Sequence, residues 1–527
     1  MTERLTGWRF ALFNVALAVG NVIALSNVPG YTILVPYAAG GLQGVNPSFG
    51  TWGTTDHMMG IVLGLPFARW LAGRYGEWRV YVAAFLFYAF FSLLCATSET
   101  IWFFVPMRFL LGLAGGVILP LGQALVLGET PEKYRTYGVA WWGVLSMAPF
   151  TLGVFMGGFW AEYVHWRMLF FSNILLGLPI AGLVLALFYG RPHRKRVTRF
   201  DTVGFILLSL VLVGLQTILN QGNDFDWFGS PVLAFLLVMV LVTLPAFLIW
   251  ELGERHPVLD VRLFRHRNYM VATVCSLLGF LVIQGTLSVF IGQLQTLLGY
   301  TPSLAGLVYL GMAVLAVPLV SIVHVLVKKM DLRYFASLDF IGFAVVLVWL
   351  GKYDKVASFD QISTPMLFFG FFLALFFAPP AAIAVQGLAG GKLIRAAEEL
   401  AMLRTAFGAY GITWQAVVQF RRTPFHQLGL ADQLGGRRFA SQDLLGQLMA
   451  KFQDLGMSEA VARAQVARVM RQQALLLGLD DAFLFGAGVF IVLAAFVWLA
   501  KPAAPARKPA PPPTLKQLQA EELMEQP

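Results

Sequence analysis

The sequence predicts an all-α polytopic membrane protein with about fourteen transmembrane helices, and three of its features support this fold class. Of the 527 residues, 58% are hydrophobic and only 13% are charged, whereas about a quarter of the residues of a soluble protein are charged. The apolar residues form runs of the roughly 20 residues that a helix needs to cross a bilayer. Basic residues cluster between these runs. So little charge cannot cover a water-soluble surface of this size, so most of the chain faces the lipid bilayer.

Fourteen apolar stretches are long enough to be transmembrane helices. The predicted spans are approximately 10–38, 51–71, 79–97, 102–127, 138–160, 168–189, 200–219, 231–250, 270–293, 303–326, 334–351, 363–387, 401–419 and 482–500. An even number of spans places both chain ends on the same side of the membrane.

Basic residues follow every second span and so indicate which side that is. They are Arg69, Arg74 and Arg79 after the second span, Lys133 and Arg135 after the fourth, Arg191, Arg194, Lys195, Arg196 and Arg199 after the sixth, Arg255, Arg262, Arg265 and Arg267 after the eighth, and Lys328, Lys329 and Arg333 after the tenth. The loops 40–50 and 294–302 carry no charge. Because cytoplasmic loops are enriched in Lys and Arg, both termini are predicted to be cytoplasmic. The same placement accounts for the net charge of +10 without a nucleic-acid partner.

A long polar stretch, residues 420–481, separates the last two spans on the external side. Ser441 and Ser458 are expected as helix N-caps, and Ala462, Val466 and Val469 share one face of the helix that follows. The stretch is therefore either a small external helical hairpin or a solvated loop. Beyond the last span, the Pro-rich residues 501–527 are predicted to be a disordered cytoplasmic tail.

An ordered series of motifs resembles a known family. The motifs are Trp70-Leu71-Ala72-Gly73-Arg74-Tyr75-Gly76-Glu77 after the second span, Arg108-Phe109-Leu110-Leu111-Gly112 and Pro120-Leu121-Gly122-Gln123 in the fourth, Gly153, Gly157 and Gly158 in the fifth, His256-Pro257-Val258-Leu259-Asp260 before the ninth, and Arg404-Thr405 near the end. They resemble the motifs of the major facilitator superfamily, and most closely its fourteen-span EmrB/QacA-type drug:proton antiporters of the EmrB kind.

The resemblance implies a major facilitator fold with two six-helix bundles, residues 1–190 and 270–500, and two extra helices within 191–269. The second bundle includes the external loop 420–481. The family exports amphipathic small molecules, such as drugs and toxic organic compounds, across the bacterial inner membrane by alternating access, driven by the proton gradient and without a cofactor. It also implies two partners, an EmrA-like membrane-fusion adaptor and a TolC-like outer-membrane channel.

Several positions depart from the family pattern. Where the first span of the family has an acidic residue, this chain has Asn27. Arg69 stands where a Gly is usual, and Val154 replaces a Pro of the fifth span. Proton antiport is thus implied by the family, while its usual coupling acid is absent.

Charges inside apolar spans are costly and need a partner or a function. Asp56 lies about one turn inside the outer end of the second span, and Arg108 about two turns inside the outer end of the fourth. We predict that they pair and that Asp56 binds the transported proton, with His57 as a weaker proton site. The alternatives are a structural role for Asp56 at a wet outer mouth and a purely structural ion pair for Arg108. Asp339, near the cytoplasmic end of its span, is expected to be a gate or loop anchor.

Polar uncharged side chains within the spans are the predicted substrate-binding set, since amides and aromatic rings suit amphipathic ligands. They are Asn27, Thr32, Gln123, Gln216, Gln284, Gln293, Trp414 and Gln415. The alternative for each is a hydrogen bond that only joins helices.

Two further groups are predicted to act in gating. Arg74, Gly76 and Arg79 form a cytoplasmic gate or simply hold their loop inside by charge. Gly153, Gly157 and Gly158 are expected to allow close packing and bending of the fifth helix.

Other functions stay open at this stage. The same fold supports proton symport or import, and the missing acid favours a dedicated exporter of an anionic metabolite or siderophore. An enzyme is disfavoured because the chain has no phosphate loop, no HExxH metal motif and no GxSxG nucleophile elbow. Cys95 and Cys275 lie in apolar segments and are expected to be packing residues, with no metal site.

Overall fold

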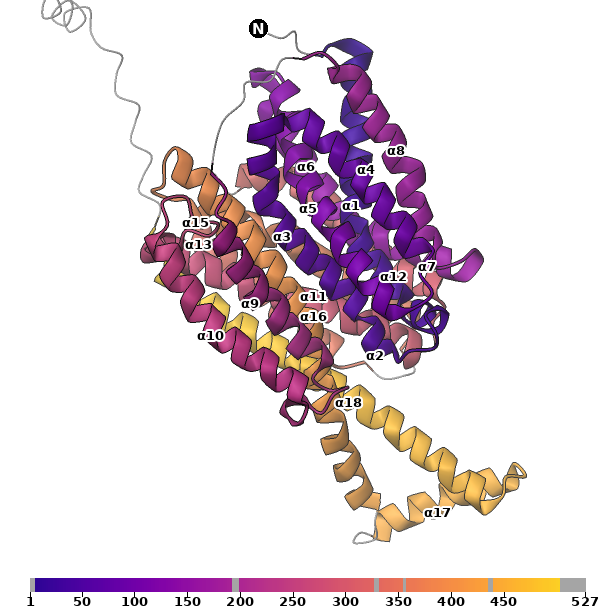
Figure 1. The fold of residues 1–527 in the computed structure, drawn as a ribbon. Coiled ribbons are helices and arrows are strands. Elements are labelled where there is room, and N and C mark those ends of the chain that lie inside the picture. Colours follow the sequence, from indigo (N-terminus) through magenta and orange to yellow (C-terminus); the bar gives the residue numbers. More distant parts are fainter. Residues whose placement is uncertain (1–4, 192–198, 327–330, 354–356, 435–438, 503–527) are drawn as a thin grey trace, which may run out of the picture.

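The computed structural model describes residues 5–191, 199–326, 331–353, 357–434 and 439–502, and these residues form helices joined by short connections (Figure 1). The first half contains α1 (Gly7–Gly41), α2 (Pro47–Gly50), α3 (Trp52–Tyr75), α4 (Glu77–Ala96), α5 (Ile101–Glu129), α6 (Arg135–Ala148), α7 (Val154–Tyr163) and α8 (Met168–Phe188). A π-helical turn, Pro149–Gly153, joins α6 to α7. The predicted tail 501–527 lies almost entirely outside the described residues.

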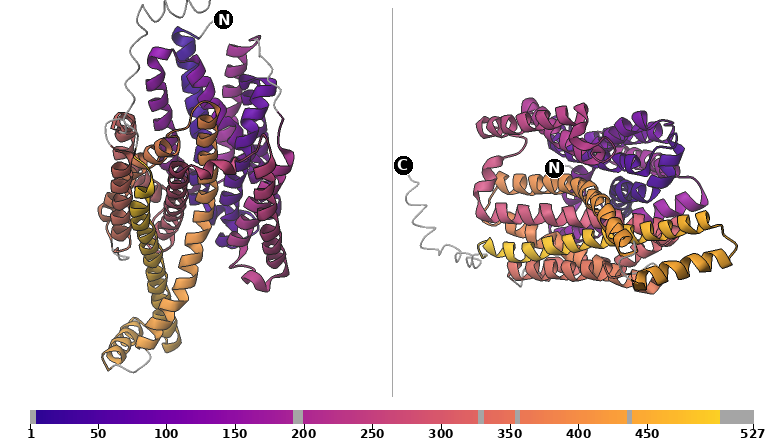
Figure 2. Two further views of the ribbon diagram at one scale, coloured as in Figure 1. Left: turned by 90° about the vertical axis from the view of Figure 1, so that its left-hand side faces the viewer. Right: turned by 90° about the horizontal axis from the view of Figure 1, so that it is seen from below.

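The second half follows two intervening helices, α9 (Thr202–Gln221) and α10 (Pro231–Gly253). It contains α11 (Arg267–Thr296), α12 (Pro302–Leu326), α13 (Leu332–Leu350), α14 (Phe359–Phe376), α15 (Ala378–Ala384), α16 (Gly391–Leu434), α17 (Phe439–Asp454) and α18 (Glu459–Phe496). The helices of each half run side by side along one common direction (Figure 2). Cys95 and Cys275 are both buried as free thiols, which confirms their expected packing role.

By length and composition, twelve helical segments of the described chain can cross a membrane. The other two predicted spans, 51–71 and 401–419, correspond to α3 and α16. Both helices carry several charged residues, which lower their hydropathy, yet α3 packs against α5 and α16 packs against α11 inside the bundles. The structure is therefore compatible with fourteen spans, with α3 and α16 as the two most polar ones.

Glycines bring α3 and α5 together. A methyl group at Gly60 would clash with the backbone oxygen of Phe109, and one at Gly112 would clash with the backbone oxygen of His57. Small residues let membrane helices approach closely enough for dispersion contacts between backbones, which replace the hydrophobic effect as the source of stability in lipid. This close approach fixes the height of the polar residues of α3 relative to Arg108 on α5.

The helices α9 and α10 pack together beside the two halves. α9 contacts both α3 and α16, so it lies along the line where the halves meet, and α10 packs on the outside of α9. Most of the apolar side chains of α10 are exposed, as expected for a helix that faces lipid. Tyr410 of α16 donates a hydrogen bond to the carbonyl of Leu212 of α9 (3.1 Å), which ties the pair to the second half.

The described residues of the polar stretch 420–481 are mostly helical and project from the bundle as a triangle (Figure 1). α16 has 44 residues and α18 has 38, about twice the number that a bilayer core requires, and α17 joins their projecting ends. Ser458 is the N-cap of α18, as predicted. Ser441, in contrast, lies inside the first turn of α17, which begins at Phe439. Of the predicted apolar face, Ala462 is buried whereas Val469 is exposed.

One carboxylate links the two helices at the base of this triangle, and we call this contact the Asp481 clasp. Asp481 of α18 accepts hydrogen bonds from Arg422 (2.5 Å) and His426 (2.7 Å) of α16. A side chain at Gly478 would collide with Thr423 (2.7 Å). The two long helices therefore leave the bundle as a fixed pair.

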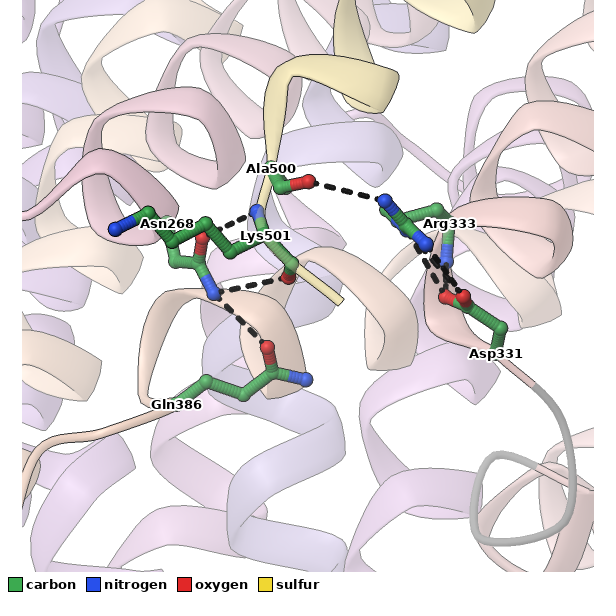
Figure 3. Close-up of polar contacts among 6 residues, drawn as sticks. All are labelled: Asn268, Asp331, Arg333, Gln386, Ala500 and Lys501. Carbon is green, nitrogen blue, oxygen red and sulfur yellow. Dashed lines mark hydrogen bonds and ion pairs between the residues drawn. The ribbon is translucent and has the colours of Figure 1, made fainter. Parts of the chain in front are cut away.

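The opposite end of α18 is fastened to the second half (Figure 3). Asn268 accepts a hydrogen bond from the amide of Lys501 (2.7 Å) and donates one to Gln386 (2.9 Å). Arg333 donates to the carbonyl of Ala500 (3.3 Å) and forms an ion pair with Asp331 (2.8 Å). The hydrogen bond from Arg333 lowers the pKa of the Asp331 carboxyl below its ordinary value.

Candidate substrate cavity

A cavity of about 1920 Å³ lies between the two halves. Its walls come from α1, α3, α5 and α6 on one side and from α11, α14 and α16 on the other. It extends from Met58 and Gln284 to the ends of α5 and α16, where Glu129 and Glu398 line it. We call this the mouth end. The amide of Leu5 donates to Glu129 there (2.8 Å), so the start of the chain lies at the same end.

Contacts between the halves close the opposite end, from which the α16–α18 triangle projects. The amide of Ser303 donates to Glu162 (3.0 Å), and Gln295 donates to the carbonyl of Ile33 (3.2 Å). A methyl group at Gly158 of α7 would clash with the backbone of Pro302 of α12. Within the described residues, the central cavity is thus closed at this end and reaches the surface at its mouth end.

The predicted packing role of the three glycines is matched by their surroundings. A side chain at Gly153 would meet Pro29 (2.8 Å), and one at Gly157 would meet the backbone of Gly30. Gly153 and Gly157 therefore hold the fifth span against α1, and Gly158 holds it against α12. The π-helical turn Pro149–Gly153 lies within the same span, and such turns are sites where a helix bends.

At the mouth, the basic residue that reaches the other half is Arg69. Its guanidinium forms an ion pair with Glu398 of α16 (2.8 Å), and both side chains are about half exposed. Arg74 and Arg79, which were predicted as gate residues, are exposed and lie over the neighbouring rings of Trp70 and Trp78. Gly76 lines the cavity and has φ +99°, a conformation that favours glycine.

Arg108 lies in a closed polar network within the first half. The side chain is 0% exposed and donates to the side-chain and backbone oxygens of Asn27 (3.1 and 3.2 Å) and to the carbonyl of Gly53 (3.0 Å). The guanidinium also lies 4.5 Å from the ring centroid of Tyr31. Asn27 in turn donates to Tyr88 (2.6 Å) and Asn173 (3.0 Å). This cation is thus held by neutral dipoles and an aromatic face.

The predicted ion pair between Asp56 and Arg108 is not formed. Among the described residues no salt bridge joins them, because Arg108 points toward Gly53, one turn earlier on α3. Asp56 is 7% exposed, and its Oδ1 atom has no hydrogen-bond partner within the described chain. His57 does face Arg108, with its Nδ1 atom 3.1 Å from the Arg108 carbonyl oxygen. Successive positions on a helix point about 100° apart, which separates the two side chains.

Of the eight predicted substrate-binding residues, Gln123 and Gln284 line the central cavity, and Thr32 lines a small pocket that shares Gln284 with it. Asn27 belongs to the Arg108 network. Gln415 donates hydrogen bonds to the hydroxyl of Thr286 and to the carbonyl of Ala482, so it joins neighbouring helices. Five of the eight therefore line neither the cavity nor the small pocket. Besides Asn27 and Gln415, these are Gln216 and Gln293, which are buried within the bundles, and Trp414, which is 40% exposed on the outside beside Phe485.

The cavity contains a cation that the pattern of polar residues did not single out. Arg404 of α16 lines it, with the guanidinium 4.6 Å from the ring centroid of Phe377 and 5.7 Å from that of Phe280. Its Nε atom is buried and has no hydrogen-bond partner in the described residues. Arg404 belongs to the motif Arg404-Thr405 of the sequence. The usable signal was its position inside the predicted span 401–419, near the cytoplasmic end, where a charge is expensive.

Carboxyl groups also meet at the mouth end of α9 and α10. Glu251 is 0% exposed, and neither of its carboxyl oxygens has a hydrogen-bond partner in the described chain. A methyl group at Gly204 would touch Oδ2 of Asp201 and lie 2.6 Å from Oε1 of Glu251. Two carboxylates that converge in this way repel each other, and a proton shared between them removes the repulsion. Asp201 lines the cavity.

Asp339 does not anchor a loop in the described structure. It is buried in α13, and both of its carboxyl oxygens lack a hydrogen-bond partner among the described residues. A sequence pattern cannot reveal that a carboxyl group is isolated, because its neighbours come from other helices.

Two helical halves around a cavity that opens at one end define a polytopic membrane transporter that works by alternating access. The chain belongs to the Major Facilitator Superfamily, which it matches over residues 17–418. It is 28% identical over 499 residues to the multidrug export protein EmrB of Escherichia coli (strain K12), covering 94% of this chain and 96% of EmrB. It is 30% identical over 473 residues to the fatty acid resistance protein FarB of Neisseria gonorrhoeae, covering 89% and 92%.

Solved structures share the fold at low sequence identity. A POT family transporter in complex with a thioalcohol-conjugated peptide superposes with a TM-score of 0.61 at 12% identity, covering 92% of this chain and 95% of that one. The D-xylose-proton symporter superposes with a TM-score of 0.57 at 14% identity, covering 93% and 98%. These likenesses confirm the predicted major facilitator fold.

Proposed function

We propose that this protein is a proton-driven exporter of amphipathic small molecules in a bacterial inner membrane. The observation that carries the proposal is the central cavity, which is large, mostly apolar and open at the end where the basic loops lie. Both termini are then cytoplasmic, and substrates enter from the cytoplasm or the inner leaflet. Relatives named for multidrug export and fatty acid resistance match the chain over nearly its whole length, which supports export over import.

Proton coupling requires a carboxyl group that changes its protonation during the cycle, and of the buried carboxyl groups in the described residues we consider two sites, one in the first half and one at the mouth. Asp56 is buried on α3 with an unpartnered oxygen. In the Asp201–Glu251 pair at the mouth end, Glu251 is buried and Asp201 reaches the cavity. Asn27 cannot exchange a proton, so the polar network around Arg108 lacks the acid that the family uses for coupling. Asp56 and the Asp201–Glu251 pair then remain as the proton sites. We infer that Asp56 carries the transported proton and that the pair is the second candidate.

The gate follows from the contacts that must break. In the described conformation Gly158 of α7 packs against α12 at the closed outer end, and the Arg69–Glu398 pair spans the mouth. Opening the outer end requires α7 and α12 to separate. The motif loop with Arg74, Gly76 and Arg79 then moves toward the second half and closes the mouth.

The α16–α18 triangle is the proposed contact to a periplasmic adaptor that leads to an outer-membrane channel. It projects from the end opposite the mouth, so it lies in the periplasm if the termini are cytoplasmic (Figure 2). Its exposed apolar side chains suit a protein partner better than water. They are Phe425, Leu428, Leu455, Val461 and Val469.

The test of export uses inverted membrane vesicles with an acidic interior and a panel of organic cations, neutral compounds and organic acids. Wild-type vesicles are expected to lose part of the pH gradient when a substrate is added. Asp56→Asn is expected to abolish this response, and Glu251→Gln is the matched comparison. If only Glu251→Gln abolishes it, the proton is carried at the pair. A wild type that responds to no compound, while still retaining its gradient, would contradict the proposal.

The adaptor contact has its own test. Deletion of residues 430–475 removes the tip of the triangle and keeps the Asp481 clasp with Arg422 and His426. We expect vesicle transport to survive this deletion and whole-cell resistance to be lost, because export across both membranes needs the partner. Retention of resistance would place the partner contact elsewhere.

A further inference from the structure

The charged side chains that line the cavity are unevenly distributed. Most of them lie within about two turns of a helix end at the mouth, as Glu129, Arg191 and Glu398 do. Arg404 is 13 residues after the start of α16, about 20 Å along the helix axis. It is therefore the charge that a ligand meets after it has passed the mouth.

Three carboxyl groups at the mouth already have partners. Glu398 binds Arg69, Glu129 binds Arg191 (2.5 Å), and Glu399 accepts a hydrogen bond from the amide of Asp260 (2.7 Å). Arg404, in contrast, has neither a hydrogen bond nor an ion pair within the part of the chain that the structure describes. The inner part of the cavity consequently has a positive potential.

The walls around Arg404 are aromatic. Phe280 and Phe377 lie against its guanidinium, and their ring centroids are 5.8 Å apart. Phe150, from the first half, lies 6.5 Å from Phe280. Aromatic faces stabilise the cation in part, but they leave the N–H groups at its edge without acceptors. A cation in this setting gains most from an anion that supplies acceptors.

We propose that Arg404 binds the negatively charged group of an amphipathic organic anion, such as a carboxylate or sulfonate, whose apolar body lies against Phe150, Phe280 and Phe377. This inference rests on the proposed export function and specifies its substrate class. The planar guanidinium matches a carboxylate or sulfonate with two parallel hydrogen bonds. Gln284 lines the same cavity and adds an amide for a second polar group of the ligand.

The position of Gln284 follows from its neighbours. Gly408 lies one turn after Arg404 on α16, and a side chain there would meet both Phe280 (2.7 Å) and Gln284 (3.1 Å). Gln284 therefore lies about one turn further from the mouth than the ring that contacts Arg404. The anionic group is bound first, and the polar or apolar remainder extends toward the closed end.

The experiment uses two permanently charged probes with the same chain, radiolabelled decanesulfonate and decyltrimethylammonium. Neither carries protons across a bilayer, so accumulation in inverted vesicles reports the carrier alone. The full-length wild type is expected to accumulate the sulfonate with a lower half-saturation concentration than the ammonium. Arg404→Gln is expected to raise the value for the sulfonate about tenfold or more, the effect of losing a charge-assisted hydrogen bond. Transport of the ammonium compound is expected to be kept or increased, which shows that the variant is folded.

Two further variants separate this site from general electrostatics. Arg404→Lys keeps the charge but not the planar fork, so a smaller rise is expected. Arg395→Gln removes a cavity-lining arginine near the mouth, where Arg395 lies 3.7 Å from Asp260, and the preference for the sulfonate is expected to remain. Equal losses in Arg395→Gln and Arg404→Gln would overturn the proposal, because only the overall potential would matter.

Other outcomes also contradict it. If the wild type accumulates the ammonium but not the sulfonate, the exporter proposal stands and the anion site is wrong. If it accumulates neither, the exporter proposal fails and the inference falls with it. If the sulfonate preference disappears in vesicles reconstituted without anionic lipid, Arg404 serves a lipid headgroup rather than the substrate.

Discussion

Each half of the molecule holds an arginine inside a membrane-spanning helix, Arg108 on α5 and Arg404 on α16, and the two differ in what surrounds them. Arg108 in the first half donates three hydrogen bonds to Asn27 and Gly53 and lies over Tyr31. Arg404 in the second half lies between Phe280 and Phe377 and faces the cavity, with no hydrogen bond in the described chain. Both are cations in a membrane protein interior, where a charge is expensive. The first is compensated by the protein, and the second is open to a ligand.

The difference shows why burial alone does not identify a functional charge. A fully satisfied network makes a region rigid and specific, and Arg108 serves this role by joining α1, α3 and α5. A cation on a cavity wall that lacks hydrogen-bond acceptors has lost hydration without full compensation. A ligand that supplies those acceptors offsets part of this desolvation cost. The number of hydrogen bonds that each guanidinium donates to the protein therefore distinguishes a structural arginine from one that is available to bind a ligand.

The largest expected effect that tests this comparison is on stability. Arg108→Gln removes three charge-assisted hydrogen bonds, at roughly 1 kcal/mol each, and leaves space behind, so we expect a loss of about 3 kcal/mol. Thermal unfolding of the purified protein, followed by fluorescence-detected size exclusion, measures it. Arg404→Gln is the matched control and is expected to change stability by less than about 1 kcal/mol. Equal destabilisation by the two substitutions would show that Arg404 is structural.

The fold could be predicted because a bilayer imposes one length and one composition on every helix. The more polar spans 51–71 and 401–419 correspond to α3 and α16, because each still contains an apolar stretch long enough to cross a bilayer. The extent of α16 and α18 beyond the membrane was left open between a hairpin and a loop. A polar amphipathic sequence fits both until the clasp at Asp481 is known.

The site was only partly predictable, for a geometric reason. Spacing along one helix gives the depth of a side chain but not its rotation relative to another helix. Asp56 and Arg108 were placed at similar depths, yet Arg108 points to Gly53. Gln123 and Gln284 were placed in the cavity, whereas Trp414 faces outward. The guanidinium of Arg404 lacks acceptors because it lies against the rings of Phe280 and Phe377. A pattern within α16 cannot predict these contacts, since both rings come from outside α16.

A second, smaller effect sharpens the comparison from the ligand's side. Gln284→Glu places a carboxylate about one turn from Arg404 in the same cavity. The new charge competes with an anionic substrate for the cation, so we expect the half-saturation concentration of decanesulfonate to rise about fivefold to tenfold. That of decyltrimethylammonium is expected to fall. Uptake into inverted vesicles measures both, and an unchanged ratio of the two would separate Gln284 from the anion site.

The smallest expected effect concerns a third arginine, which is paired but exposed. Arg69 and Glu398 join the halves across the mouth, and about half of each side chain is in solvent. Exposed ion pairs contribute at most about 1 kcal/mol, so Glu398→Arg alone is expected to change the transport rate no more than about fivefold. The reversed pair, Arg69→Glu with Glu398→Arg, is expected to recover the wild-type rate because attraction across the mouth is restored. Transport at 0.05 and 0.5 M salt provides the check, since screening removes the effect of the single variant. A single variant that stays slow at high salt would mean that Glu398 acts through contacts other than charge.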